Sequence, residues 1–152
     1  MSSSVQANPA HPLSGQLENG THRLPVRVYY EDTDFSGVVY HASYLRFMER
    51  GRTELLRHLS VAQSDLHADA AGLAFAVRRM TIDFRKPARM DDLLEIATRP
   101  HEMRGASMTL AQEVRRGEEV LVVAEVMVAA VREGRAVRIP DGLRRALGQG
   151  SG

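Results

Sequence analysis

Two aspartates and a histidine lie close together in one short stretch of this sequence. Asp32, Asp34 and His41 all fall within residues 30–44, which read YEDTDFSGVVYHASY. A carboxylate can act as a general base on water or as a nucleophile toward an activated carbonyl. Backbone N–H groups at the start of a helix have no intrahelical partner and can stabilise an oxyanion. The stretch therefore predicts attack on an activated carbonyl, with Asp34 as the reacting carboxylate.

Each of these residues also permits a second interpretation. Aspartate is common in turns, where it accepts hydrogen bonds from nearby N–H groups. Residue type alone therefore favours a structural role for Asp34, and still more for Asp32. His41 offers an imidazole or, at a helix start, its backbone N–H, but it is equally compatible with an exposed histidine that has no role. Ser36 lacks the surrounding G-x-S-x-G motif of a nucleophilic serine, so it is not assigned as one.

The composition excludes several classes of function. The 152 residues suggest one domain, and 43% hydrophobic and 26% charged residues are typical of an ordinary soluble protein. A net charge of +1 gives no strong field for nucleic acid. Without cysteine there is no disulfide, thiol nucleophile or cysteine–zinc site. The histidines show no paired ligand spacing, and no phosphate-binding glycine motif is present, so we expect neither a metal nor a cofactor.

Targeting signals are also missing from the sequence. The first eight residues lack the basic and apolar regions of a secretory signal. The longest apolar run, residues 120–131, is too short to span a bilayer and contains Glu125. We therefore expect a cytoplasmic protein with no membrane span.

A strand and a helix flank the Asp34 turn. Apolar residues alternate after Pro25 and predict a strand that reaches Tyr30. Gly37 ends the turn, because a residue without a Cβ atom adopts unusual dihedral angles easily. Ser43 is the predicted N-cap of the helix, with His41 in the helix entry. This arrangement predicts that the turn delivers its side chains to the helix N-terminus.

The helix has one apolar face with a glycine in its middle. The positions that share this face are Tyr44, Met48, Gly51, Leu55 and Leu59. An interior glycine costs roughly 1 kcal/mol relative to alanine. We therefore expect a sheet to approach the helix closely at Gly51, which predicts a central helix packed on a sheet.

Four more strands follow the helix. They are predicted over residues 73–84, 94–100, 106–114 and 120–131, with a hairpin at Arg116-Gly117-Glu118. In the first of them the apolar positions change from odd to even, which predicts a bulge at Arg78–Arg79. Short helices are predicted near residues 64–71 and 140–147. The fold class is therefore α+β, with a curved antiparallel five-stranded sheet wrapped around one long central helix.

The Asp34 stretch also resembles a known family. The motif D-T-D-x-x-G-V-V-Y-H-x-x-Y, followed by F-M-E-R-x-R-T-E-L-L-R, is similar to the hotdog-fold acyl-CoA thioesterases. Within these it resembles the subgroup associated with the Tol-Pal system and related to 4-hydroxybenzoyl-CoA thioesterase. The resemblance covers roughly residues 24–140. It implies a hotdog thioesterase domain at 21–147, while the composition of the two ends predicts a flexible tail at 1–20 and a second flexible tail at 148–152.

The resemblance implies roles for individual residues. Asp34 is expected to be the catalytic carboxylate, and the helix-entry amide of His41 is expected to polarise the thioester carbonyl. Both general-base and covalent catalysis need the same carboxylate, so the sequence does not separate them. The residues expected to contact an acyl-CoA substrate are Thr33, Gly37, Tyr40, Arg85 and Lys86. The basic pair in this set equally fits a solvated strand face.

The resemblance also implies an oligomer. Family members pair their sheets into dimers and often form tetramers with interfacial active sites, so we expect a homodimer or homotetramer. A non-hydrolytic module that binds acyl-CoA or an acyl carrier is the alternative on the same scaffold. A hotdog dehydratase for 3-hydroxyacyl thioesters ranks last, because its acid–base group is expected elsewhere in the chain.

Overall fold

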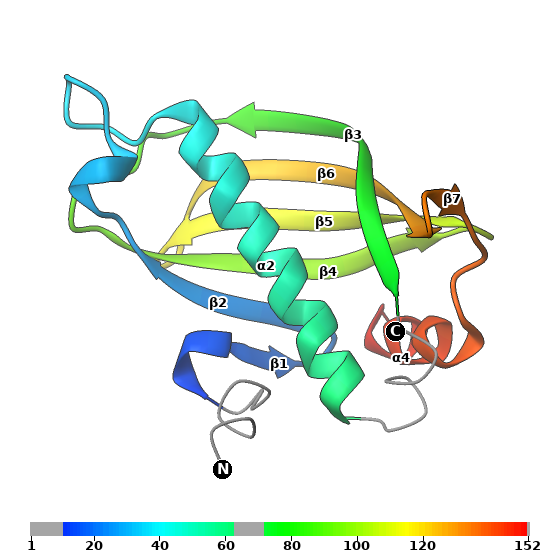
Figure 1. The fold of residues 1–152 in the computed structure, drawn as a ribbon. Coiled ribbons are helices and arrows are strands. Elements are labelled where there is room, and N and C mark those ends of the chain that lie inside the picture. The colour runs from blue at the N-terminus through cyan, green and yellow to red at the C-terminus, as the bar shows by residue number, and fades with distance from the viewer. Residues whose placement is uncertain (1–10, 63–71, 152) are drawn as a thin grey trace, which may run out of the picture.

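The computed structural model describes residues 11–62 and 72–151. Within these residues one long helix packs against one face of an antiparallel sheet (Figure 1). The elements in chain order are η1 (Pro12–Ser14), β1 (Gln16–Glu18), β2 (Thr21–Arg27), η2 (Tyr30–Asp32), α2 (His41–Ala62), β3 (Leu73–Phe84), β4 (Leu93–Met103), β5 (Ser107–Arg116), β6 (Glu119–Arg132), β7 (Arg135–Ala136) and α4 (Asp141–Ser151). This two-layer arrangement confirms the predicted α+β class.

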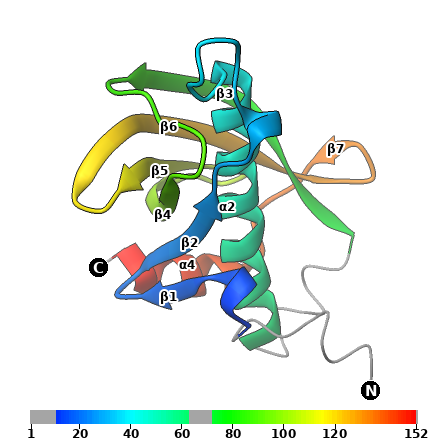
Figure 2. The ribbon, with the colours of Figure 1, turned by 90° about the vertical axis from the view of Figure 1, so that its left-hand side faces the viewer.

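The sheet places β3 at one edge and β1 at the other. The strand order is β1-β2-β4-β5-β6-β3, with β7 paired to the end of β6. All pairs are antiparallel, and the side view shows α2 lying along one face of the twisted sheet (Figure 2). The five long strands are the predicted ones. Among the described residues the sheet has seven strands, so the predicted number was wrong by the two short strands β1 and β7.

Both segments predicted as flexible tails contain secondary structure among the residues that the structure describes. Residues 12–18 form η1 and β1, and β1 pairs with β2. The buried imidazole of His22 donates from Nε2 to the Ser14 carbonyl at 2.8 Å and ties this segment to the sheet. At the other end, α4 continues to Ser151. Local composition does not report this order, because it depends on tertiary pairing; residues 1–10 and 152 lie outside the described residues.

Helix α2 begins before the predicted cap. Its first residue is His41, and Ser43 is buried with its hydroxyl donating to the Asp32 carbonyl at 3.2 Å. Ser43 therefore fastens the preceding turn, and the prediction that it is the N-cap was wrong. The predicted apolar face is confirmed, since all of its side chains are buried. At Gly51 a Cβ atom would lie 2.8 Å from Thr98 Oγ1, which confirms the expected close approach.

The strands follow their predicted patterns with one extension. The register of β3 against β6 shifts between Val77 and Arg79, which confirms the predicted bulge. Strand β4 continues through Pro100 to Met103, past its predicted end, because a second irregularity after Pro100 restores its pairing with β5. The short helix predicted near residues 64–71 lies outside the described residues. No helix in the described part of the chain is long and apolar enough to cross a membrane.

Candidate functional site

Asp32 fastens the turn to the start of α2. Its buried carboxylate accepts a hydrogen bond from the Tyr29 amide at 2.9 Å. Its carbonyl accepts from the Tyr40 amide at 2.9 Å and from the Ser43 hydroxyl. A buried aspartate with these bonds holds the backbone in place. This is the structural role that its position in the sequence suggested.

The Asp34 turn is held by hydrogen bonds between its own backbone groups. Thr33 and Val39 form an antiparallel bridge, and within it the Asp34 amide donates to the Val38 carbonyl at 2.9 Å. The Gly37 amide donates back to the Asp34 carbonyl at 3.1 Å. Gly37 has φ +84°, as its position in the turn predicted. The Asp34 side chain is thereby presented near the tip of a hydrogen-bonded loop.

The Asp34 carboxylate is exposed and has one oxygen free. Its Oδ1 accepts hydrogen bonds from the Ser36 hydroxyl at 2.6 Å and from the Ser36 amide at 2.9 Å. The hydroxyl bond, helped by the backbone bonds, holds the pKa of Asp34 below its ordinary value and outweighs desolvation. The group is therefore ionised at neutral pH. Oδ2 accepts no hydrogen bond from any described residue, which leaves it available to a reacting molecule.

The first two amides of α2 have no acceptor among the described residues. His41 and Ala42 open the helix, so neither amide has an intrahelical partner. The amide just before them, that of Tyr40, is already taken by the Asp32 carbonyl. The exposed His41 ring stacks on Phe84, with centroids 4.4 Å apart and planes at 28°. The imidazole is thus held against the end of β3, while the backbone N–H stays available.

The predicted site residues divide between two cavities. The first, called here the Asp34 cavity, has a volume of about 620 Å³ and is lined by Thr33, Asp34 and Gly37. The second, called the His41 cavity, has a volume of about 220 Å³ and is lined by His41, Arg85 and Lys86. Tyr40 is exposed and belongs to neither lining. A single chain therefore does not gather all of these residues around one cavity.

The basic residues of the His41 cavity are held by exposed ion pairs. Arg85 contacts Asp83 at 2.9 Å, and Lys86 contacts Glu119 at 2.8 Å. Exposed pairs of this kind contribute only about 0 to 1 kcal/mol. Both cations can therefore exchange these partners for a bound anion at little cost.

Large hydrophobic side chains surround Asp34, and the sequence reasoning missed them. Tyr30, Phe35 and Met90 are exposed and line the Asp34 cavity. Clustered exposed apolar side chains are typical of a surface that binds a ligand or another protein. The available signal was Phe35 itself, an aromatic residue in a turn that otherwise consists of polar residues and glycine.

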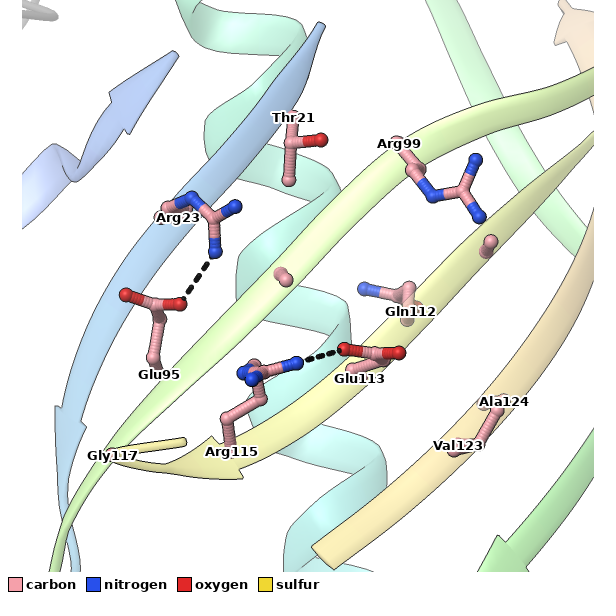
Figure 3. Close-up of a pocket in the computed structure, with 12 residues that line it drawn as sticks. Thr21, Arg23, Glu95, Arg99, Gln112, Glu113, Arg115, Gly117, Val123 and Ala124 are labelled. Atoms are coloured by element: carbon pink, nitrogen blue, oxygen red, sulfur yellow. Dashed lines mark hydrogen bonds and ion pairs between the residues drawn. The ribbon is translucent and has the colours of Figure 1, made fainter. Parts of the chain in front are cut away.

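Another cavity lies on the face of the sheet away from α2 (Figure 3). Its volume is about 420 Å³, and its charged side chains are mainly matched in pairs. Arg23 contacts Glu95 at 2.8 Å, and Arg115 contacts Glu113 at 2.8 Å. None of the predicted site residues lines it. It therefore adds nothing to the chemistry of the Asp34 turn.

The known proteins that this chain is similar to are described as thioesterases or thioester hydrolases. The family model described as the thioesterase superfamily matches residues 36–123. The chain is 53% identical over 110 residues to the acyl-CoA thioester hydrolase YbgC of Escherichia coli O6:H1, covering 72% of this chain and 81% of that protein. It is 47% identical over 119 residues to the acyl-CoA thioesterase YbgC of Haemophilus influenzae, covering 78% and 86% respectively.

The solved structures point to the same family. The crystal structure of a probable thioesterase from Bartonella henselae superposes with a TM-score of 0.68 at 44% identity, over 80% of this chain and 99% of that one. The family model begins at Ser36, so its match does not include Asp34. The long helix packed on an antiparallel sheet is the hotdog layout. The chain therefore belongs to the thioesterase superfamily, as a thioester hydrolase with the hotdog fold.

Proposed function

We propose that this protein is an acyl-CoA thioesterase in which Asp34 is the catalytic carboxylate. The observation that carries the proposal is the geometry of the turn. An ionised carboxylate, with one oxygen that accepts no hydrogen bond from the described residues, lies on a loop that the Asp32 carbonyl ties to the start of α2 through the Tyr40 amide and the Ser43 hydroxyl. The relatives named as acyl-CoA thioester hydrolases support the substrate class.

The reaction needs a base or nucleophile and a place for negative charge. Oδ2 of Asp34 either removes a proton from the attacking water or attacks the acyl carbon itself. In the second route the resulting anhydride is then cleaved by water. Either way the carbon–sulfur bond breaks, and coenzyme A leaves as a thiol beside a carboxylic acid. The amides of His41 and Ala42 would donate to the carbonyl oxygen as its charge develops.

A second copy of the chain would complete the site. In one chain Asp34 is open to solvent and lines a different cavity from His41. Strand β3 is a sheet edge with one unpaired side, and its exposed Val77 and Phe84 lie on that strand. Such edges are usually covered. We therefore propose a homodimer that pairs along β3, with interfacial active sites, and a homotetramer formed from two such dimers.

The basic residues next to the helix start would bind the phosphates of coenzyme A. Arg85 and Lys86 line the same cavity as His41, and their current partners are the exposed Asp83 and the half-buried Glu119. Phosphate oxygens are strong acceptors for both kinds of cation. Thr33, Gly37 and Tyr40 are proposed to contact the substrate around the turn.

Replacing Asp34 with Asn tests the proposal. The amide keeps the shape of the side chain but is not basic, so hydrolysis should fall by about 10²- to 10⁴-fold while folding persists. The assay is the release of free thiol from a panel of short, long and aromatic acyl-CoA substrates. Glu31→Gln is the matched control, because it removes an exposed carboxylate from the same cavity. Folded Asp34→Asn with turnover close to wild type would refute the assignment.

The same measurements separate the enzyme from a binding module. Calorimetry that detects tight acyl-CoA binding to the wild-type protein, with no thiol release from any substrate of the panel, would favour the non-hydrolytic alternative. Thiol release that depends on Asp34 would exclude it.

A further inference from the structure

A fourth cavity is lined by residues of α2 and of the strands β3, β5 and β6. We call it the α2–β3 cavity, and its volume is about 360 Å³. Its apolar lining consists of Leu56, Phe75, Val77, Met108, Leu110 and Val128. Its polar lining consists of Glu49, Arg52 and Thr53, all from α2. The cavity is thus a largely apolar space whose helix side carries one guanidinium, Arg52, and one carboxylate, Glu49.

Arg52 is half-buried in this wall and only partly satisfied. Its Nη1 donates to Oε1 of Gln112 at 3.0 Å, and Gln112 is itself buried and bonded to Thr98. Of the five guanidinium donors, no other has an acceptor among the described residues. Glu49 lines the same cavity but forms no ion pair with Arg52 within 4.0 Å in the described part of the chain.

A half-buried charge whose hydrogen bonds are only partly satisfied is costly, and a matching anion relieves that cost. Burial lowers the pKa of the Arg52 guanidinium, because desolvation disfavours its charged form. The nearby Glu49 carboxylate acts in the opposite direction and raises this pKa. The planar guanidinium binds a carboxylate through two parallel hydrogen bonds, which Lys or a neutral donor does not reproduce. Gln112 holds one edge of the guanidinium, so its remaining donors are pre-positioned for an incoming anion.

We propose that the α2–β3 cavity receives the acyl group of the substrate and that Arg52 binds a carboxylate at the far end of that group. The preferred substrates would then be medium-length acyl-CoA thioesters that end in a carboxylate. This inference rests on the acyl-CoA thioesterase function proposed for the chain. An apolar cavity of about 150 Å³ holds one benzene molecule, so this cavity has room for a chain of roughly six to ten non-hydrogen atoms.

The proposed dimer brings this cavity to a reacting thioester. Arg52 lies eleven positions after His41, about 16 Å along the same helix. Phe84, which stacks on His41, and Phe75, which lines the cavity, stand near opposite ends of β3. Antiparallel pairing of two β3 edges would place the Phe84 end of one copy beside the Phe75 end of the other. A thioester held at one helix start would therefore extend its acyl group into the cavity of the other copy.

The test compares adipoyl-CoA with hexanoyl-CoA, whose acyl chains have the same length and differ in the terminal group. Arg52→Met should lower kcat/KM for adipoyl-CoA by about 10- to 100-fold, the loss of a charged hydrogen bond. Hexanoyl-CoA should change by no more than about threefold. Arg50→Met is the matched control, because it removes an exposed guanidinium of the same helix outside the cavity lining. Equal changes for the two substrates, or no change for either, would overturn the proposal.

A second variant of Arg52, a third substrate and a binding measurement test the same contact. Arg52→Gln removes the charge but can still donate to Gln112, so it should lose the adipoyl preference even if Arg52→Met does not fold. Retention of the wild-type preference by Arg52→Gln would count against the proposal. A 6-hydroxyhexanoyl-CoA substrate that wild type prefers over adipoyl-CoA would overturn the carboxylate assignment. Calorimetry can measure the affinity of Asp34→Asn for adipoyl-CoA, with and without Arg52→Gln. The difference in affinity reports the contribution of Arg52 even if no substrate is hydrolysed.

Discussion

Gly51 is the point where helix and sheet come closest, and its replacement by alanine tests that contact. The added Cβ atom would lie 2.8 Å from Thr98 Oγ1, 2.9 Å from Ile96 Cγ2 and 3.2 Å from Gln112 Nε2. These three side chains are buried, so none can swing into solvent. Gln112 also donates to Thr98 and to the Met48 carbonyl, so moving it strains both hydrogen bonds.

Two opposing effects decide the stability of Gly51→Ala. Alanine gains about 1 kcal/mol in helix propensity over glycine. Overpacking a close-packed core costs about 1 to 3 kcal/mol, and a Gln112 donor left without an acceptor costs about 1 to 3 kcal/mol more. The net effect should be a destabilisation of roughly 1 to 5 kcal/mol. For a chain of this size that corresponds to a fall in Tm of roughly 3 to 20 °C.

Circular dichroism during thermal and urea unfolding, at one fixed protein concentration, measures this change. Gly148→Ala is the matched control, because Gly148 lies in α4 and a Cβ atom there meets nothing within 4 Å. It should leave the protein as stable as wild type or slightly more stable. A Gly51→Ala protein that is also as stable as wild type would show that helix propensity dominates and that the close approach is not restrictive.

Two further predictions concern buried polar groups. The Tyr44 hydroxyl accepts a hydrogen bond from the buried Ala88 amide at 2.9 Å, so Tyr44→Phe should cost about 1 to 3 kcal/mol in urea unfolding; an unchanged midpoint would contradict this. Burial lowers the pKa of His22 below its ordinary value of about 6.5, so the unfolded chain takes up this proton first as the pH falls. Wild-type stability should therefore be full above about pH 6.5 and decrease below it. His22→Gln should show a flatter dependence of the urea midpoint between about pH 7 and pH 5, and parallel profiles would exclude His22 as the cause.

The order and type of the long elements could be predicted because they depend on local spacing. The helical face from Tyr44 to Leu59 and the strand alternations are periodic over neighbouring residues, and each periodicity matches one backbone geometry. The change of phase in β3 predicted the bulge before Arg79 for the same reason. The interior glycine at position 51 predicted a close approach, because its cost to the helix requires compensation.

The errors in the sequence predictions all involve tertiary contacts. Strand β1 exists because it pairs with β2 and because Ser14 accepts a hydrogen bond from the buried His22. Ser43 has the residue type of an N-cap, but its hydroxyl bonds to the Asp32 carbonyl instead. Composition and residue type cannot report these partners, since each partner lies elsewhere in the chain.

The sequence by itself determined the family, the order and type of the long elements, and Asp34 as the candidate carboxylate, because a motif and a periodicity are local properties of the chain. Only the tertiary structure decided how these residues are arranged. It separated the Asp34 cavity from the His41 cavity, left β3 as a sheet edge among the described strands and placed the half-buried Arg52 beside a largely apolar cavity. The physical reason is that burial, charge pairing and the shape of a cavity depend on which distant segments meet, and the spacing of residues along the chain does not specify this.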